Sequence, residues 1–224
     1  MQFRHELKYP LNYADYLTVR QRLRAVLHKD PNADKNGEYK IRSLYFDTPE
    51  DKALLDKLNG TAIREKFRIR LYNNDSSHIK LEKKTKVNGL GNKQSAKLTA
   101  EQALAVTAGE WDWMINHENE LVREFYVKLK CQRLEPKVLV DYIREPFVFD
   151  AGNVRVTLDR EIRTGNARGN WLTDEGITLP TSENAYLMEV KYDNFLPALI
   201  KDIIQLDSRR AAAFSKYAIC RKYG

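Results

Sequence analysis

The stretch REKFRIRLYNNDSSHIKLEKK, from Arg64 to Lys84, decides the fold of this chain. Successive side chains of a β-strand point to opposite faces. Positions 64, 66, 68 and 70 are all Arg or Lys, whereas the alternate positions are apolar: Phe67, Ile69 and Leu71. A polar turn at residues 73–77 follows, and the alternation then resumes with Lys80, Glu82 and Lys84. The stretch therefore predicts a β-hairpin with one ionic and one apolar face.

An ionic strand face is usually the solvated outer surface of an antiparallel sheet. The same alternation, however, returns in predicted strands at residues 3–9, 153–163 and 185–192. Two further strands are predicted at residues 39–47 and 137–149, the second broken by Pro146. Most predicted strands thus have an apolar face and an ionic face.

Helical spacing of apolar residues predicts the intervening elements. We expect helices over residues 12–27, 48–58, 99–108, 111–133, 197–206 and 211–222. The pair at about residues 99–133 reads as a helical insertion among strands. Residues 85–97, with Gly89, Gly91 and several lysines, suggest a mobile basic loop, and residues 164–182 suggest a loop anchored by Trp171. No repeat or linker divides the chain, so we expect one domain over residues 1–224.

Composition favours a soluble protein with an anionic partner. The 224 residues are 42% hydrophobic, which is enough for a substantial core, and 38 Lys and Arg against 31 Asp and Glu give a net charge of +7. Nucleic acid, nucleotide and phosphate polymer all remain open. Cys131 and Cys220 form neither a metal motif nor a disulfide scaffold. Because there is no apolar run of ~20 residues and no signal peptide, we expect a cytoplasmic protein without a transmembrane segment.

Two packings of such strands are open. If the ionic faces point outward, the apolar faces meet in a sandwich and leave the amphipathic helices little apolar surface to cover. If they point inward, the strands close into an antiparallel β-barrel whose outer surface the helices sheathe. The number of apolar helix faces favours the second packing, an α+β fold.

A barrel lined with cations implies a ligand, because unpaired buried charges cost several kcal/mol each. Glu6, Glu82 and Glu189 lie on the same faces and are oxygen ligands suited to Mg²⁺ or Mn²⁺. Cations together with a carboxylate-held metal are the parts that phosphoryl transfer needs. Further candidates for substrate binding on the predicted strands are Arg42, Lys66, Lys80 and Lys191.

The ordered motifs RHELKY, IRSLYFDT, FRIRLY, IKLEKKT, VRVTLDREI, YLMEVKY and FSKY extend from Arg4 to Tyr217. With them the chain resembles the VTC domain, a polyphosphate polymerase of the CYTH-like triphosphate tunnel metalloenzyme superfamily. The resemblance implies an antiparallel β-tunnel with flanking helices, in agreement with the inward packing. It also implies Glu189 as the metal ligand and a set of phosphate-binding residues: Lys8, Arg68, Arg70, Lys84, Arg144, Arg155 and Lys216.

Several positions qualify the resemblance. Ser215 and Tyr45 are weaker site candidates, and a packing role fits Tyr45 better. The Glu-x-Glu-x-Lys signature of the wider superfamily appears here as Arg4 to Lys8, with Arg4 in place of a carboxylate. That replacement tilts the choice toward the polymerase branch and away from triphosphatases and adenylyl cyclases. The four histidines show no ligand spacing.

We therefore expect transfer of the ATP γ-phosphoryl group to a growing polyphosphate chain, with release of ADP. Two rivals are a hydrolase of triphosphate or polyphosphate with the same fold, and a non-catalytic module that binds polyphosphate or RNA. The expected partners are ATP and inorganic polyphosphate or triphosphate, with no specific nucleic acid. A membrane-protein partner stays open.

Overall fold

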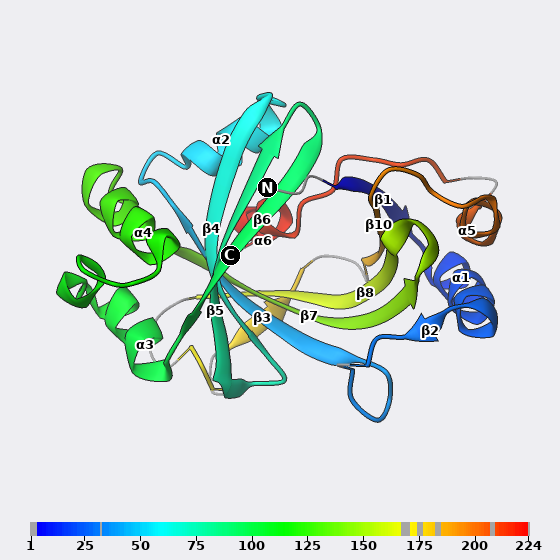
Figure 1. Ribbon diagram of the computed structural model, residues 1–224, viewed down its shortest axis with the longest axis horizontal. Helices are drawn as coiled ribbons and strands as arrows, with labels where there is room; N and C mark the ends of the chain where they lie inside the picture. The colour runs from blue at the N-terminus through cyan, green and yellow to red at the C-terminus, as the bar shows by residue number, and fades with distance from the viewer. Residues whose placement is uncertain are drawn as a thin grey trace.

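The computed structural model describes residues 4–31, 33–166, 171–173, 177–181, 185–206 and 209–223, and Figure 1 shows its elements. The strands are β1 (His5–Leu11), β2 (His28–Lys29), β3 (Tyr39–Asp47), β4 (Ile63–Tyr72), β5 (Asp75–Val87), β6 (Leu90–Leu98), β7 (Glu135–Phe149), β8 (Val154–Gly165), β9 (Thr178–Pro180) and β10 (Tyr186–Tyr192). The helices are α1 (Tyr13–Val26), α2 (Lys52–Leu58), α3 (Ala100–Ala108), α4 (Glu120–Cys131), α5 (Ala198–Ile204) and α6 (Lys216–Tyr223), with 3₁₀ turns η1 (Asp112–Met114) and η2 (Ala151–Asn153).

The strands form one antiparallel sheet, so the predicted α+β class is confirmed. Its main path runs β1-β10-β8-β7-β3-β4-β5-β6, with β2 paired to β7 and β9 paired to β8. The first strand of the chain thus lies beside the last one, which brings the ionic residues of β1 and β10 next to each other. Lys8 stands opposite Glu189 in that pair, and Glu6 stands opposite Lys191.

The expected closed barrel is wrong, because regular pairing does not join the two edges of the sheet. Among the described residues, the backbone pairing of the edge strands β1 and β6 is limited to an isolated bridge between Arg4 and Gly91, with N to O distances of 3.1 and 3.3 Å. The bridge involves the residue just before β1 and the second residue of β6. From His5 to Leu11, β1 is paired with β10 along one edge.

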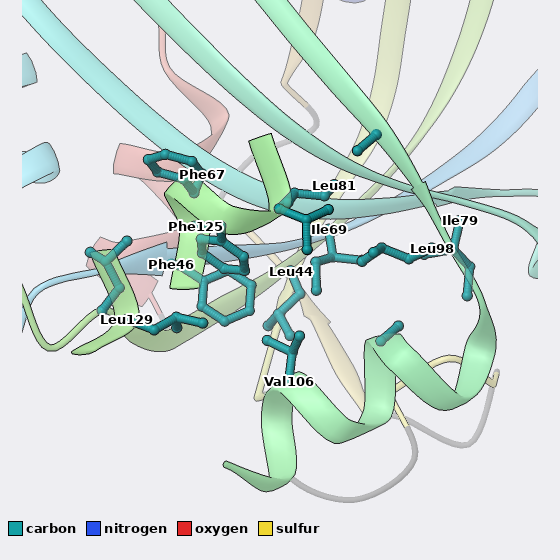
Figure 2. Packing of buried hydrophobic residues seen from close by; sticks show 14 of the residues in the cluster. Leu44, Phe46, Phe67, Ile69, Ile79, Leu81, Leu98, Val106, Phe125 and Leu129 are labelled. Atoms are coloured by element: carbon teal, nitrogen blue, oxygen red, sulfur yellow. The ribbon is translucent and has the colours of Figure 1, made fainter. Parts of the chain in front are cut away.

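Helices cover the outer, apolar face of the sheet, as predicted. Around β3, β4 and β5, the helices α3 and α4 insert Val106 and Phe125 between the strands' apolar side chains (Figure 2). The ring of Phe125 stacks on Phe67 at a centroid distance of 5.2 Å and meets Phe46 edge-on at 5.0 Å. Interlocking aromatic contacts of this kind fix α4 against the hairpin.

A second cluster does the same at the other end of the sheet. Val19 and Leu23 of α1 and Ile200 of α5 pack against Val156 of β8 and Val190 of β10. The apolar side chains of the alternating strands therefore pack under helices on the outer face. Their ionic positions are left to the inner face.

The terminal helix α6 behaves differently, because it packs on the inner face. Tyr217 and Cys220 of α6 are buried together with Tyr45, Val140 and Tyr142, which point inward from β3 and β7. Lys216, at the start of α6, is thus placed inside the fold. No helix among the residues described above is both long and apolar enough to cross a membrane.

The predicted mobile loop at residues 85–97 is wrong, because these residues form the end of β5 and all but the last residue of β6. The two strands are joined by Asn88 and Gly89, whose φ values are +47° and +88°. Positive φ at both turn positions is the geometry of a tight hairpin turn that Asn-Gly favours. The signal for this hairpin was therefore present in the sequence.

Other boundaries also shift. The helix expected from Trp111 begins only at Glu120, where Asn119 Oδ1 accepts from the backbone N–H of Leu121 at 3.0 Å and caps it. Pro146 does not break β7, since it lies past Arg144, the last residue of β7 that pairs with β3. The helix expected from Ala211 starts at Lys216. Trp171 is fully buried, as its anchoring role requires.

Candidate functional site

Three adjoining cavities lie along the inner face of the sheet. The first, of about 380 Å³, lies among residues of β1, β3, β4, β6 and β8. It shares Arg70 and Arg144 with a central cavity of about 100 Å³. The central cavity in turn shares Lys8 and Lys66 with a third cavity of about 140 Å³. The three follow one another along β4, and Lys84 of β5 is in the wall of all of them.

The central cavity gathers most of the predicted phosphate-binding residues. Strand alternation brings them from β1, β4, β5, β7 and β10, and α6 adds one more. Its cations are Lys8, Lys66, Arg68, Arg70, Lys84, Arg144, Lys191 and Lys216, and its one carboxylate is Glu189. Ser215 is also in the wall. Eight cations against one carboxylate make a site for a highly charged anion.

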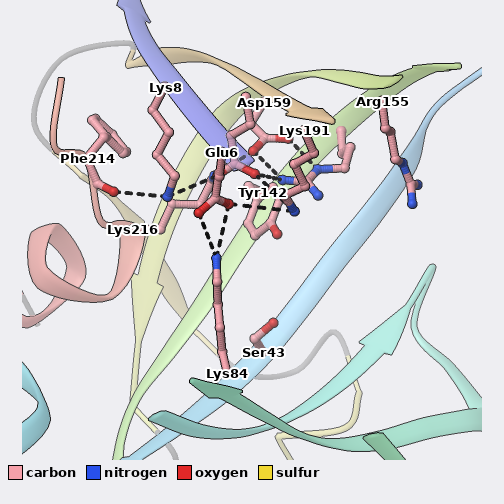
Figure 3. Close-up of polar contacts among 12 residues, drawn as sticks. Glu6, Lys8, Ser43, Lys84, Tyr142, Arg155, Asp159, Lys191, Phe214 and Lys216 are labelled. Atoms are coloured by element: carbon pink, nitrogen blue, oxygen red, sulfur yellow. Dashed lines mark hydrogen bonds and ion pairs between the residues drawn. The ribbon is translucent and has the colours of Figure 1, made fainter. Parts of the chain in front are cut away.

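Glu189 lies at the centre of one ion-pair network, and Figure 3 shows two of its partners, Lys8 and Lys216, with Asp159 nearby. Its carboxylate is 3.4 Å from Lys8 Nζ, 3.0 Å from Arg144 Nη2 and 3.1 Å from Lys216 Nζ. Burial opposes ionisation, but Lys216, Lys8 and Arg144 outweigh it and hold the pKa of Glu189 well below its ordinary value. Glu189 is therefore an anion at any physiological pH.

Asp159 of β8 supports the same network and was not predicted as a site residue. It is fully buried and accepts two bonds of 2.6 Å from Arg144, while Lys216 Nζ lies 2.5 Å from Oδ2. Burial disfavours the charge on Lys216, but Asp159 and Glu189 raise its pKa above the ordinary value. The alternation in VRVTLDREI places Asp159 on the ionic face, so a signal existed.

A second network surrounds Glu82 on β5. Arg68, opposite it on β4, donates through Nε at 2.7 Å, Lys93 Nζ lies at 3.1 Å and Arg70 Nη1 at 3.7 Å. Burial opposes ionisation of Glu82, but Arg68, Arg70 and Lys93 lower its pKa far more. Glu82 therefore orients the two arginines while it neutralises part of their charge.

Tyrosines separate the cations of the cavity. Arg68 Nη1 donates to the Tyr45 hydroxyl at 2.7 Å, and Arg70 Nη2 donates to the Tyr142 hydroxyl at 3.1 Å. The Tyr142 ring also lies 4.7 Å from Lys216 Nζ, within cation–π range. Alternation in β3 puts Tyr45 on the inner face, whereas Arg42 is on the outer face. The Tyr45 hydroxyl therefore contacts Arg68, in addition to the packing contacts of its ring.

Glu6 completes the inner face on β1. Both of its oxygens lie 3.0 Å from Lys84 Nζ, and Lys191 Nζ lies 3.7 Å from Glu6 and 3.9 Å from Glu189. One ammonium thus contacts both carboxylates. Burial disfavours the charge of Lys191, and this effect, together with Lys84 and Arg144, lowers its pKa to about 7 despite the two glutamates.

Three residues predicted to bind phosphate or substrate lie outside the wall of the central cavity, as do the predicted metal ligands Glu6 and Glu82. Arg42 is on the outer face, 2% exposed, where Nη2 lies 2.6 Å from Asp141 Oδ2, so its expected place among the substrate-binding residues is wrong. Arg155 lines the 380 Å³ cavity and pairs with Asp30 at 2.7 Å. Lys80 stands opposite Arg70 in the hairpin, yet it is in the wall of none of the three cavities.

The donor set suits a metal only if substrate supplies further ligands. Within the described ranges there is no group of three His, Cys, Asp or Glu side chains able to hold an ion. Glu6 and Glu189, linked by Lys191, offer two neighbouring carboxylates. Mg²⁺ is commonly held by one or two carboxylates together with phosphate oxygens and water. These residues therefore fit an ion that arrives with a phosphate ligand, not a preformed protein cage.

The comparison with solved structures finds proteins from a bacterium, a virus and an archaeon. An adenylate cyclase-like protein from Bacillus halodurans has a TM-score of 0.50 and 13% identity, with 85% of this chain and 80% of that one covered. The Mimivirus capping enzyme triphosphatase has a TM-score of 0.43 and 10% identity, with 87% and 82% covered. The PH1819 protein of Pyrococcus horikoshii has a TM-score of 0.43 and 14% identity, with 90% and 84% covered.

The likeness to the Bacillus protein shows a shared fold. No curated protein matches the sequence. The model of the VTC domain family matches residues 3–223, almost the whole sequence, and the chain therefore belongs to the VTC domain family.

Proposed function

We propose that the protein is a polyphosphate polymerase, which transfers the γ-phosphoryl group of ATP to the end of a polyphosphate chain and releases ADP. The observation that carries the proposal is the central cavity, with its eight cations and one carboxylate in about 100 Å³. Such a volume is suited to a row of phosphates rather than to a nucleoside. Membership of the VTC domain family supports the same substrate class.

The arginines would hold the phosphates by forked, charge-assisted hydrogen bonds. Arg68 and Arg70 are aimed by Glu82, Tyr45 and Tyr142, while Arg144 is aimed by Asp159. Because their partners already fix these side chains, little reorganisation is needed when substrate binds. The two substrate phosphates would be held in line by groups on opposite walls of the cavity.

A divalent ion, Mn²⁺ or Mg²⁺, would be held by Glu189 with Glu6 and by substrate oxygens, and it would neutralise charge that develops during transfer. The predicted third carboxylate, Glu82, is engaged by Arg68, Arg70 and Lys93. Its role as a metal ligand remains a prediction. Lys191, between Glu6 and Glu189, would balance their charge before substrate arrives.

The state of the carboxylates favours a polymerase over a hydrolase. A general base works best with a pKa near the working pH, whereas cations hold the pKa values of Glu6, Glu82 and Glu189 far below neutrality. A water nucleophile would find no good base among these carboxylates, and of the described residues in the cavity wall only Lys66 and Lys191, whose pKa values are lowered to about 7, could take its proton. A phosphate acceptor is already an anion and needs none.

The deciding experiment is product analysis after incubation with ATP and Mn²⁺ or Mg²⁺. We expect ADP and a ladder of polyphosphate, with one phosphate incorporated for each ADP released. Orthophosphate in equal amount to ADP, without a ladder, would identify a hydrolase. Binding of polyphosphate without turnover of ATP in either metal would leave a binding module.

A further inference from the structure

One cation of the central cavity is held in place without an acidic partner. Seven of the eight cations in its wall pair with a carboxylate, whereas Lys66 of β4 has no such pair among the described residues. The Lys66 ammonium instead meets two residues at the start of α6. It donates to Ser215 Oγ at 3.3 Å and lies 5.2 Å from the centre of the Tyr217 ring, within the range of a cation–π contact. Neutral groups therefore set the position of Lys66.

The ring of Tyr217 is in turn fixed by two contacts. It stacks on Tyr45 at a centroid distance of 5.1 Å, with an angle of 27° between the ring planes. Its hydroxyl donates to Asp47 Oδ2 at 2.6 Å, and Asp47 is not in the wall of the central cavity. Burial and the bond to Asp47 raise the pKa of Tyr217 above its ordinary value, so the hydroxyl keeps its proton. The ring thus lines the cavity while the hydroxyl is bound to Asp47.

Asp47, the last residue of β3, is 1% exposed and has no part in the proposed chemistry. Its Oδ1 accepts from the backbone N–H groups of Thr48 and Ala53 at 2.8 Å each. Its Oδ2 accepts from the backbone N–H of Leu54 at 3.0 Å as well as from Tyr217. Residues 53 and 54 belong to the first turn of α2. One buried carboxylate therefore fixes both the start of α2 and the hydroxyl end of Tyr217.

A carboxylate acceptor affects Tyr217 in two ways. A charge-assisted hydrogen bond is about twice as strong as a neutral one, so Asp47 holds the ring in one orientation. Attraction of the phenolic proton toward Asp47 also polarises the hydroxyl and makes the ring more electron-rich. A more electron-rich face attracts a cation more strongly. Both effects keep the ammonium of Lys66 over the Tyr217 ring.

We propose that Asp47 is a positioning residue of the phosphate-binding cavity, which acts through Tyr217 to hold Lys66 where it meets the bound phosphates. This inference rests on the proposed function, because it takes Lys66 to be one of the cations that bind the substrate. Asp47 itself does not touch the substrate. Because Asp47 holds Lys66 through a neutral ring, it does not pair with the ammonium, which remains available to an anion.

A double-mutant cycle tests this inference. Dissociation constants for tripolyphosphate are measured by calorimetry at pH 6, where Lys66, with its pKa lowered to about 7 by burial and nearby cations, is mostly charged. The proteins are the unaltered chain, Tyr217→Phe, Lys66→Met and the double variant. Tyr217→Phe keeps the ring and removes only the donor to Asp47. Tyr16→Phe is the control, because Tyr16 is a buried tyrosine of α1 on the outer face.

We expect Tyr217→Phe to weaken tripolyphosphate binding about 3- to 10-fold, the size of effect that a weakened cation–π contact implies. In the Lys66→Met background the same change should have almost no further effect, since the hydroxyl acts through the ammonium. Tyr16→Phe should bind like the unaltered protein. An equal loss with and without Lys66, or no loss in either background, would overturn the inference.

The carboxylate is tested by Asp47→Ala, with Thr48→Ala as its matched control. Both changes loosen the start of α2, because Thr48 Oγ1 accepts from the backbone N–H of Lys52 at 3.2 Å. Only Asp47→Ala also frees the Tyr217 hydroxyl. We expect Asp47→Ala to weaken binding as Tyr217→Phe does, with no further loss when the two are combined, and Thr48→Ala to leave binding unchanged. Equal losses in Asp47→Ala and Thr48→Ala would mean that α2, not Tyr217, carries the effect.

Failure of the proposed function would look different. If the unaltered protein did not bind tripolyphosphate, the central cavity would not be a phosphate site, and this inference would fall with it. If tripolyphosphate bound equally well to the unaltered protein, Tyr217→Phe and Asp47→Ala, only the inference would fall. Thermal melting without ligand checks that each variant is folded, and if Asp47→Ala is not, the cycle of Tyr217 and Lys66 decides.

Discussion

Lys216 Nζ lies 2.5 Å from Asp159 Oδ2, so the first residue of the terminal helix is tied to the middle of β8 inside the fold. Both side chains are almost fully buried. The same carboxylate holds Arg144 of β7 by two bonds of 2.6 Å. One unpredicted aspartate thus positions two predicted phosphate-binding cations from different elements.

Asp159→Asn should therefore impair both folding and function. Removal of one partner from a buried ion pair typically costs about 3–5 kcal/mol, and here two cations would share only Glu189. We expect a lower free energy of unfolding in urea denaturation. The start of α6 should also be less firmly fixed to β8, because Lys216 loses its ion pair with Asp159. A control is Asp193→Asn, which removes an ion pair 2.7 Å long with Arg4, a partly exposed residue at the bridge between the sheet edges. Equal stability of Asp159→Asn and the unaltered protein would contradict this account.

Glu189→Gln should abolish turnover but preserve binding of tripolyphosphate. The change keeps the shape of the side chain and removes the charge that would hold a divalent ion. Lys8, Arg144 and Lys216 would remain to attract the anion. Phosphoryl transfer from ATP and calorimetric binding of tripolyphosphate are the two measurements. Normal turnover in this variant, or normal turnover of the unaltered enzyme in excess chelator, would remove the metal from the mechanism.

The ligand-free protein should become more stable as the pH rises from about 7 toward 10, in part through Lys66. Burial first, then Lys84, Lys8, Lys57 and Arg64, lower the pKa of Lys66 to about 7 in the folded state. The unfolded value is about 10.4. Between the two, the unfolded chain carries more protons, so the free energy of unfolding increases with pH. The destabilisation is complete below pH 7 and disappears above about pH 10.

Lys66→Met should accordingly be more stable than the unaltered protein at pH 6 in urea denaturation. The difference should shrink by pH 10. Lys35→Met, at an exposed position, serves as the control and should change little at either pH. Lower stability of Lys66→Met at pH 6 would mean that the contact with Ser215 outweighs the repulsion from neighbouring cations.

Much of this architecture follows from local alternation. The period-two pattern correctly separated Arg68 and Arg70 from Phe67 and Ile69, and it also contained Asp159 and Tyr45 on the inner face. The Asn88–Gly89 turn was a local signal that the abundance of lysine around it obscured. Alternation grouped Arg42 with Leu44 and Phe46, so the same pattern already placed it on the outer face, away from the cavities.

Other features depend on residues that are distant in sequence. The partner of Arg42 is Asp141, and its Nη1 also lies 3.3 Å from the backbone oxygen of Trp171. No local pattern in the sequence predicts these contacts. The incomplete closure of the sheet likewise depends on residues far apart in sequence, because β1 and β6 are its two edge strands and pair only through the bridge between Arg4 and Gly91 in the described part of the chain.

Truncation of a side chain on the inner face of β4 should lower activity, whereas truncation on the outer face should lower stability. Arg70 is 5% exposed on the inner face, where it donates to Ser43 Oγ and to Tyr142 at 3.1 Å each. A charge-assisted contact with phosphate is worth about 1.5–3 kcal/mol, so Arg70→Ala should lower kcat/KM for ATP roughly 10- to 100-fold. Its stability should change little, because Glu82 keeps Arg68 and Lys93 as partners.

Ile69→Ala is the matched change on the outer face. Ile69 is fully buried in the cluster that α3 and α4 complete, so truncation leaves a cavity and should cost about 2–5 kcal/mol of unfolding free energy. The folded fraction should retain its kcat/KM, because the side chain faces away from the cations. Urea denaturation and steady-state kinetics on both variants give a crossed result if the faces are assigned correctly. Full activity in Arg70→Ala together with unchanged stability in Ile69→Ala would reverse the two faces, and the phosphate-binding cavity could not then lie where β4 places it.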